Sequence, residues 1–293
     1  MRERLGYAVY RVLSSLFGLL PEPAMRRVGQ SVGWVASFIA RQRFAMAVRH
    51  QTRVLGPSAD ARRSARRVFI HYGRYWAEVF WMRARRREAA LARTQMDGIH
   101  NLHDAVASGR GVVLALPHMG NWEIAGLRSA REGARVLAVA ENLGNEHIVR
   151  WFIEMRAMME IDIVIARAGA GVSRVLLERL RSGGVIALLC DRDLGGKGVP
   201  TRLFGESTTL PAGPVALADR SGAVLLPAGT YFNDGAGHRF DIRPPLEIPD
   251  LPDAEARVAE GTQRLAEVIE AIIRVAPEQW HLVQPNWPGD REV

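Results

Sequence analysis

A histidine stands at the end of an aliphatic segment, with a carboxylate a short distance further on. Residues 111–116 read "GVVLAL", Pro117 and His118 follow, and Glu123 comes five positions after the histidine. Free imidazole titrates close to neutral pH, so a histidine can accept a proton from a hydroxyl group there. A neighbouring carboxylate fixes the tautomer of such a histidine and stabilises the imidazolium that forms. We therefore predict that His118 is a general base.

Two carboxylates are candidates for the partner of His118. Glu123 does not share a regular helix face with it, so a contact requires His118 to lie in the turn before the helix. Asp191 follows the apolar run "GVIALLC" and could approach from the end of a second strand. No G-x-S-x-G motif stands between an expected strand and an expected helix, as a nucleophile elbow does, which favours direct transfer to an acceptor hydroxyl that His118 activates. The choice between the two carboxylates is open at this point.

Short apolar runs alternate with helical patterns from Gly111 onward. Strands are expected over 111–117, 134–141, 161–166, 184–191, 223–232 and 238–245. Helices are expected over 121–133, 145–160, 172–184, 211–222 and 254–275. This order is typical of an α/β fold, and we predict a mixed central sheet flanked by helices. Ligands of such sheets bind beyond the carboxyl ends of the strands, where His118 is expected to lie.

Residues 1–95 have a helical pattern and differ in character from the rest of the chain. Their longest uncharged runs, over 12–21 and 28–40, are too short to span a bilayer, and several arginines lie around both. That composition is typical of helices that lie on an anionic membrane, although a helical hairpin packed on the core would share it. We predict a membrane-associating helical segment over 1–95 that continues into an α/β core over 96–293. The "RARRR" run at 83–87 would meet lipid phosphates or water.

The composition limits the classes of protein to consider. The 293 residues are 48% hydrophobic and 24% charged, as in globular proteins, and the net charge of +8 predicts an anionic partner. That partner could be a phospholipid surface, a phosphorylated substrate or a nucleic acid. The aromatic residues over 69–80 recur at helical spacing and suit a buried helix face, which argues against a nucleic-acid site. Cys190 is the one cysteine, which excludes an internal disulfide and a cysteine-based metal site.

The remaining histidines have no partner motif. We expect six of them at the surface because they lie in charged or turn contexts: His50, His71, His100, His103, His147 and His238. His281, in "WHLVQPNW", is expected to pack among the aromatic residues around it.

Four sequence blocks, in order, carry a family resemblance. They are "YGRYWAEVF", "GRGVVLALPHMGNWEIAG", "DRDLGGKGVPTRLFGESTTLPAGPVALADRSGAVLLP" and "PEQWHLVQPNW". His118 and Glu123 match the H-x4-D/E signature of glycerolipid-type acyltransferases, and "HMGNWE" in full resembles the lipid A late acyltransferase family. Within that family, the blocks are most similar to the branch of phosphatidylinositol mannoside acyltransferases. H-x4-E alone occurs by chance in chains of this length, whereas four ordered blocks over nearly the whole chain are specific.

The resemblance implies a peripheral enzyme on the cytoplasmic face of the plasma membrane. It would move a long fatty acyl chain from acyl-CoA, palmitoyl-CoA for example, to a mannose hydroxyl of phosphatidylinositol mannosides. It would need no cofactor and no metal, and it would bind an anionic membrane surface but no nucleic acid. The chain length of the donor, the acylated hydroxyl and the oligomeric state are left open.

The resemblance also implies roles for individual residues. His118 would be the general base and Glu123 the acidic member of the motif. Asp191 stands where the family places an acidic residue that pairs with the histidine; the related enzymes carry Glu there, so the shorter side chain is a departure. Arg156, in "RWFIEMR", would hold the phosphates of the donor or the oxyanion.

Three further positions are assigned to substrate binding. Lys197, in "GGKG", and Arg220, at the end of "PAGPVALADR", are candidate CoA contacts. A solvated turn explains Lys197 equally well, and a cation that offsets a helix dipole explains Arg220. Asn121 is grouped with them, and we expect it to cap the helix that follows while Trp122 packs beside it.

Three alternative functions are compatible with parts of the sequence. The same chemistry could act on lipid A or a lysophospholipid, because the shape of the acceptor pocket is not readable from sequence. A thioesterase would use His118 to activate water in place of a sugar hydroxyl. A non-catalytic basic protein that binds membrane or nucleic acid would explain the charge but leave His118, Glu123 and Asp191 without a role.

Overall fold

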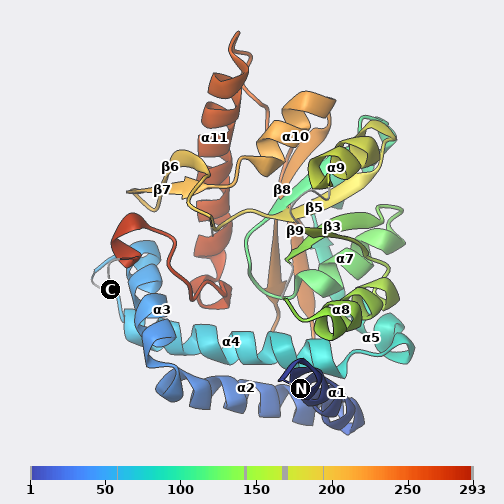
Figure 1. The fold of residues 1–293 in the computed structure, drawn as a ribbon, viewed down its shortest axis with the longest axis vertical. Coiled ribbons are helices and arrows are strands. Elements are labelled where there is room, and N and C mark those ends of the chain that lie inside the picture. The colour runs from blue at the N-terminus through green and yellow to red at the C-terminus, as the bar shows by residue number, and fades with distance from the viewer. Residues whose placement is uncertain (1, 58, 142–143, 167–170, 194, 292–293) are drawn as a thin grey trace.

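The alternating apolar runs form a seven-stranded sheet. The computed structural model describes residues 2–57, 59–141, 144–166, 171–193 and 195–291, and its strand order is β1-β9-β8-β2-β5-β3-β4 (Figure 1). The strands are β1 (Thr94–Asp97), β2 (Val112–Leu116), β3 (Val136–Glu141), β4 (Asp162–Ala166), β5 (Val185–Leu189), β8 (Val224–Phe232) and β9 (His238–Ile242). β8 and β9 pair antiparallel, and every other pair in this sheet is parallel. The predicted mixed sheet is confirmed.

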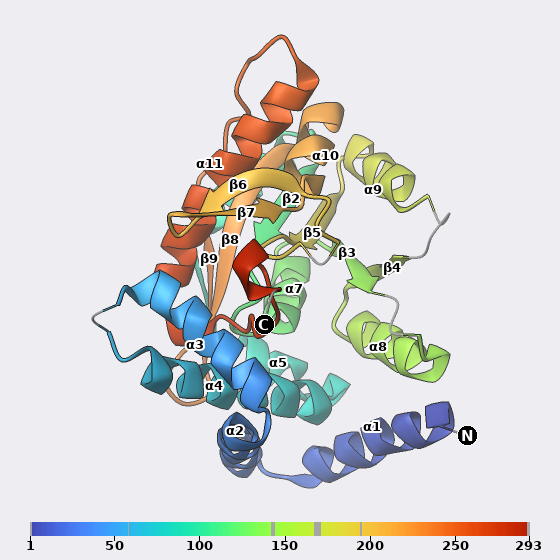
Figure 2. The same cartoon turned by 60° about the vertical axis from the view of Figure 1, so that its left-hand side comes forward.

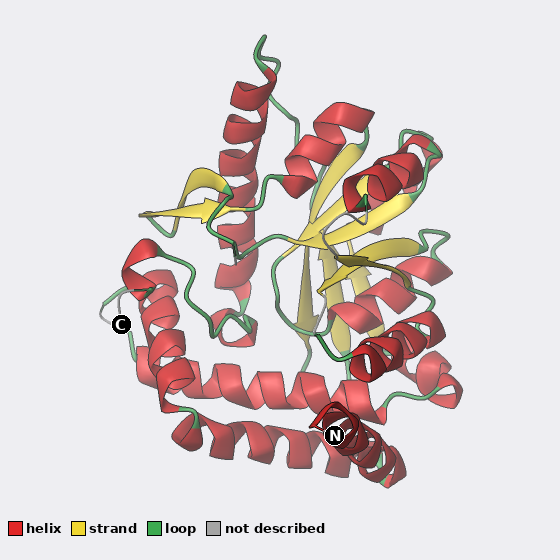
Figure 3. Cartoon of the chain, viewed as in Figure 1, coloured by secondary structure: helices red, strands yellow, loops and turns green. Residues whose placement is uncertain are grey.

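Helices cover both faces of the sheet, as predicted (Figure 3). On one face lie α6 (Ile99–Ala107), α7 (Trp122–Arg131) and α8 (Glu146–Met158), and on the other α9 (Val172–Arg181), α10 (Gly213–Ser221) and α11 (Ala254–Val275). All five residues of the central strand β2 are buried, and alternate side chains enter the two cores. Burial on both faces explains why this strand is an uninterrupted aliphatic run.

Four N-terminal helices pack at one end of the sheet. They are α1 (Arg2–Leu19), α2 (Glu22–Ile39), α3 (Arg41–Leu55) and α4 (Ala61–Trp81). α4 lies against the core, and α1 and α2 pack on the outer side of α4 (Figure 2). The backbones of α2 and α4 touch at Gly33 and Gly73, where an added Cβ would lie 2.1 Å from the Phe69 carbonyl oxygen and 2.2 Å from that of Gly29. Of the helices in the described ranges, none is both long and apolar enough to cross a bilayer.

Several elements were not predicted from the sequence. The predicted boundary at residue 95 falls inside β1, and α5 (Arg87–Leu91), α6 and the antiparallel hairpin of β6 (Val199–Leu203) and β7 (Glu206–Leu210) are additional. Short 3₁₀ turns complete the structure at Ala84–Arg86, Pro277–Gln279 and Pro288–Asp290.

The "RARRR" run is in large part structural, which corrects the expectation that it meets lipid or water. Arg83 donates hydrogen bonds to the carbonyl oxygens of Ser14 and Phe80, and Arg86 to those of Gly18 and Trp81. These bonds satisfy carbonyl groups near the ends of α1 and α4 and hold the two helices together.

Candidate active site

His118 lies in the turn between β2 and α7, at a cavity of about 570 Å³. The cavity is bounded by α4, α7, α8, the ends of β3, β4 and β5, and the segment 281–284. Its polar lining includes His118, Glu141, Arg156, Arg192, Asp193, His281 and Gln284, and much of the remaining wall is apolar or aromatic. The predicted position of His118 beyond the carboxyl end of a strand is confirmed.

Asp191 is the carboxylate that contacts His118. Its Oδ1 lies 2.5 Å from His118 Nδ1, and Trp280 Nε1 donates to its Oδ2 at 2.7 Å. The contact arises because β2 and β5 are adjacent and parallel, with Leu116 opposite Leu189, so that the residues just beyond both strands meet. Asp191 supplies this contact despite having a shorter side chain than the Glu that the family resemblance leads one to expect.

The electrostatics of Asp191 favour the carboxylate form. Complete burial alone would raise its pKa, but attraction to His118 and hydrogen bonds from His118 and Trp280 outweigh burial and lower it from 3.8 to about 2. An ionised acceptor at 2.5 Å requires the proton to be on Nδ1 of His118. Nε2 then carries the free lone pair, and none of the described residues forms a hydrogen bond with it.

The turn that carries His118 is held by the C-terminal segment. The backbone N–H of His281 donates to the carbonyl oxygen of His118 at 2.7 Å, and that of Gly120 donates to Gln279 at 3.1 Å. Gly120 has a φ of +57°, and a Cβ there would lie 2.2 Å from the carbonyl oxygen of Thr230, so the turn requires glycine. The "PEQWHL" segment thus supplies both a partner for Asp191 and the support for the histidine backbone.

Glu123 binds Arg156, and the carboxylate that bonds to His118 is that of Asp191. The Arg156 Nε and one terminal nitrogen donate to Glu123 Oε1 at 3.0 and 2.8 Å, and Tyr75 donates to the same oxygen at 3.4 Å. Burial would lower the pKa of Arg156, but the Glu123 carboxylate outweighs burial and raises it. Between the two candidates, the geometry therefore favours Asp191 as the residue that orients His118.

Arg192 is a functional candidate that the sequence analysis missed. It lines the cavity directly after Asp191, and its ion pair with the exposed Glu141 is loose, at 3.8 Å. Arg156, in contrast, has its charge balanced by Glu123 inside the wall. The sequence carries one signal for this residue: Arg192 directly follows Asp191 beyond the apolar run that forms β5.

The other proposed binding residues do not line this cavity. Lys197 is exposed on the loop before β6, and Arg220 is exposed in the last turn of α10. Asn121 is buried and caps α7, with its Oδ1 accepting from the N–H of Ile124 at 3.3 Å. The predicted cap is confirmed. The oxygen and the nitrogen of the Asn121 side-chain amide both form hydrogen bonds within the protein, so the structure gives this residue a structural role, and its assignment to substrate binding stays a prediction.

Three of the histidines expected at the surface are not there. His50 is buried with Nε2 2.9 Å from the Gln284 carbonyl oxygen, His238 is buried beside Glu78, and His71 is half-buried. The packing of His281 among aromatic rings is confirmed.

An α/β sheet with a histidine and a buried aspartate at adjacent strand ends, beside a largely apolar cavity, is a frame suited to acyl transfer. The chain belongs to the family described as bacterial lipid A biosynthesis acyltransferase, which it matches over residues 2–288, and it is an acyltransferase. It is 34% identical over 284 residues to a phosphatidylinositol mannoside acyltransferase of Mycobacterium tuberculosis, covering 89% of this chain and 88% of that one. The protein of the same name from Mycolicibacterium smegmatis is 36% identical, with 83% and 79% covered. A lipid A biosynthesis acyltransferase of Haemophilus influenzae is 26% identical, with 64% and 57% covered.

Proposed function

We propose that this acyltransferase moves a long fatty acyl chain from acyl-CoA to a mannose hydroxyl of a phosphatidylinositol mannoside, with His118 as the base. The observation that carries the proposal is the hydrogen bond between His118 and the buried Asp191 at the wall of a largely apolar cavity. Support for the acceptor comes from the names of the mycobacterial relatives, which the chain covers over most of their length.

The chemistry follows from the orientation of His118. Asp191 accepts a hydrogen bond from the protonated Nδ1 of His118, which leaves Nε2 free to act as the base. Nε2 takes the proton from the acceptor hydroxyl as the hydroxyl oxygen attacks the thioester carbonyl carbon. The C–S bond of the resulting tetrahedral intermediate breaks, and CoA leaves as its thiolate. The proton on Nε2 then passes to the sulfur, which returns His118 to its starting state. Every step uses the acceptor, the donor and this pair, without a covalent acyl-enzyme.

An apolar wall suits the acyl chain. Val139, Ile163 and Leu188 line the main cavity, and a smaller one of about 60 Å³ continues between the sheet and α7. The two cavities share Trp122, Val139, Arg156, Leu188 and Leu189 as wall residues. Each methylene of a chain that leaves water for such a wall contributes about 0.8 kcal/mol.

Arg192 suits the phosphates of the donor better than Arg156 does. The Arg156 guanidinium forms two-pronged hydrogen bonds with Glu123, so its charge is already balanced. Arg192 lies next to Asp191, its ion-pair partner among the described residues is the loosely held Glu141, and it can form charge-assisted hydrogen bonds with phosphate oxygens. We assign to it the anchoring role that the resemblance suggests for Arg156. For Lys197 and Arg220, outside the cavity, CoA contact stays an untested prediction.

The outer helices suit a membrane surface. α1 and α2 expose large apolar side chains: Val9, Val12, Leu16, Leu19, Val28, Val32, Trp34, Val35, Phe38 and Ile39. On α2, Val28, Val32, Val35 and Ile39 line one shallow apolar groove together with the exposed Arg27. Apolar faces with neighbouring arginines bind anionic bilayers without crossing them, and we propose such peripheral binding at the cytoplasmic face of the plasma membrane.

A panel of acceptors tests the proposed function. Radiolabelled palmitoyl-CoA is supplied with phosphatidylinositol dimannoside, a lipid A precursor, a lysophospholipid or no acceptor, and labelled products are separated. We expect a more acylated mannoside and little free palmitate. Transfer to another lipid alone would replace the acceptor, and palmitate release that no acceptor suppresses would identify a thioesterase.

A further inference from the structure

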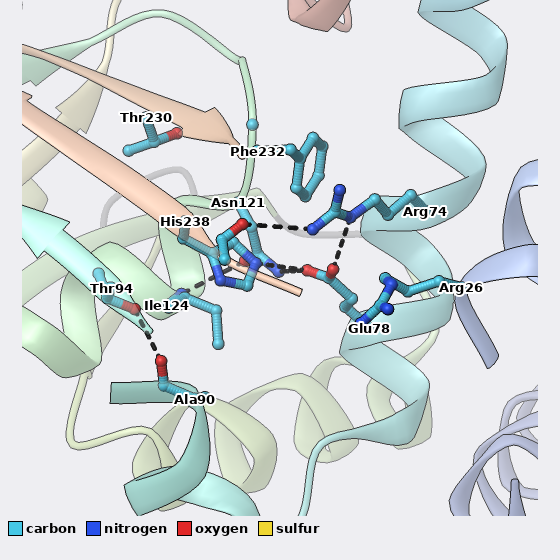
Figure 4. Close-up of polar contacts among 12 residues, drawn as sticks. Arg26, Arg74, Glu78, Ala90, Thr94, Asn121, Ile124, Thr230, Phe232 and His238 are labelled. Carbon is cyan, nitrogen blue, oxygen red and sulfur yellow. Dashed lines mark hydrogen bonds and ion pairs between the residues drawn. The ribbon is translucent and has the colours of Figure 1, made fainter. Parts of the chain in front are cut away.

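A buried carboxylate on α4 contacts the catalytic motif from behind. Glu78 is only 5% exposed, and its two oxygens accept hydrogen bonds from three side chains (Figure 4). Arg74 Nε donates to Oε1 at 2.8 Å, Asn121 Nδ2 to Oε2 at 2.7 Å and His238 Nε2 to Oε2 at 2.9 Å. The carboxylate therefore joins α4, β9 and the turn that carries His118.

We propose that Glu78 is a positioning residue for the reaction, which holds the turn of His118 in place through Asn121. The inference rests on the proposed function, in which His118 is the base. Glu78 does not line the cavity, so it acts through the turn and not on a substrate.

Asn121 transmits the position of Glu78 to the turn. Its Oδ1 caps α7 by accepting from the N–H of Ile124, while its Nδ2 donates to Glu78. An asparagine amide has two different ends, and the carboxylate acceptor fixes which end faces the helix. His118 lies three residues before this cap, so the start of α7 and the position of the imidazole are linked by a short stretch of backbone.

The charge of Glu78 makes this link strong. Burial would raise its pKa, but the charges and hydrogen bonds of His238 and Arg74 outweigh burial and lower it from 4.5 to about 2. An ionised acceptor forms shorter and stronger hydrogen bonds than a neutral one. Two further contacts support the backbone of the turn: Thr230 donates to the Met119 carbonyl oxygen, and His281 Nε2 lies 3.0 Å from that of Gly120. The Glu78 contact adds a charged hydrogen bond from α4 to a side chain of the turn.

Two variants and their double variant test the proposal. Asn121→Ser keeps a capping oxygen for α7 and removes the amide that reaches Glu78. Glu78→Gln removes the charge, and Arg74 keeps its hydrogen bonds to the carbonyl oxygens of Asn233 and Gly237. His238→Gln is the matched control, because it changes another donor to the same oxygen, while Arg74 still faces the carboxylate and Asn121 keeps its hydrogen bond to it.

We expect kcat to fall roughly 10- to 100-fold in both variants, with KM for acyl-CoA nearly unchanged, because a misplaced base slows chemistry more than binding. The double variant should be no slower than the worse single variant, since both remove one link. The control should keep kcat within about twofold. Losses that multiply in the double variant, or wild-type kcat in both single variants, would overturn the proposal.

Hydrogen exchange supplies a readout that does not depend on turnover. Backbone amides of residues 119–124 should exchange about tenfold faster in Asn121→Ser and Glu78→Gln than in the wild type or in His238→Gln. Unchanged exchange in the two variants would contradict the positioning role. If the wild type transfers palmitate to no acceptor, the proposed function fails while this measurement still decides whether Glu78 holds the turn.

Discussion

Replacing Asp191 with asparagine isolates the contribution of one buried charge. Asp191→Asn keeps the shape of the side chain and an oxygen for Trp280, but it removes the charge that faces Nδ1 of His118. An amide can also present its NH₂ group to Nδ1, which would favour the wrong tautomer and place the proton on Nε2. We expect kcat to fall by about 10³-fold, as for carboxylates that orient a catalytic histidine.

The same substitution has a predictable cost in stability. The folded-state pKa of about 2 against 3.8 corresponds to about 2 kcal/mol of stabilisation at neutral pH. Because the folded-state pKa is the lower one, this contribution is present above about pH 4 and is lost as the pH falls towards 2. Asp191→Asn should therefore lower Tm by about 4 °C at pH 7. The difference from the wild type should shrink in acid, where the wild-type carboxyl is also neutral.

Two assays test these predictions for Asp191→Asn. They are palmitate transfer with saturating substrates at pH 7, and thermal unfolding measured from pH 7 to pH 3. Asp191→Glu is the matched control, since it keeps the charge and adds one methylene in a fully buried site. We expect its activity to lie between those of the wild type and Asp191→Asn. If Asp191→Asn were as active as the wild type, or if its Tm deficit did not change with pH, the role assigned to the charge would be refuted.

Three other substitutions probe the remaining parts of the site. Glu123→Gln leaves the buried Arg156 without a carboxylate, and it should destabilise the fold by about 3–5 kcal/mol in denaturant titrations; a change under about 1 kcal/mol would contradict a structural ion pair. Arg192→Ala should raise KM for acyl-CoA about tenfold with little change in kcat, and an unchanged KM would remove Arg192 as the phosphate anchor. Val32→Glu, on the exposed face of α2, should weaken sedimentation with anionic vesicles about tenfold while a detergent-solubilised substrate is still turned over; equal sedimentation would argue against that face.

The elements around the site were predictable because apolar periodicity is a local property. The run over 111–117 contains β2, and the helix expected over 254–275 is α11 with the same bounds. β1 and the hairpin of β6 and β7 were missed because they are short and polar, and tertiary pairing decides their conformation.

The partners within the site were harder to predict. The spacing of His118 and Glu123 allows a contact if His118 lies in the turn before the helix. His118 does lie there, yet Glu123 binds Arg156, which lies on a different helix. Which of two carboxylates reaches a histidine depends on strand order, and the pairing of β2 with β5 brings Asp191 there. The burial of His238 beside Glu78 is likewise a property of packed elements, and no local pattern signals it.

The role of His118 as the general base is tested most simply by the rate of palmitate transfer by His118→Ala, compared with the wild type and with His103→Ala. His103 is an exposed histidine whose ring contacts Glu132 on the surface, so its loss controls for the removal of an imidazole. We expect His118→Ala to lose at least about 10³-fold in kcat while remaining folded, and His103→Ala to match the wild type. A folded His118→Ala protein with wild-type turnover would contradict this role.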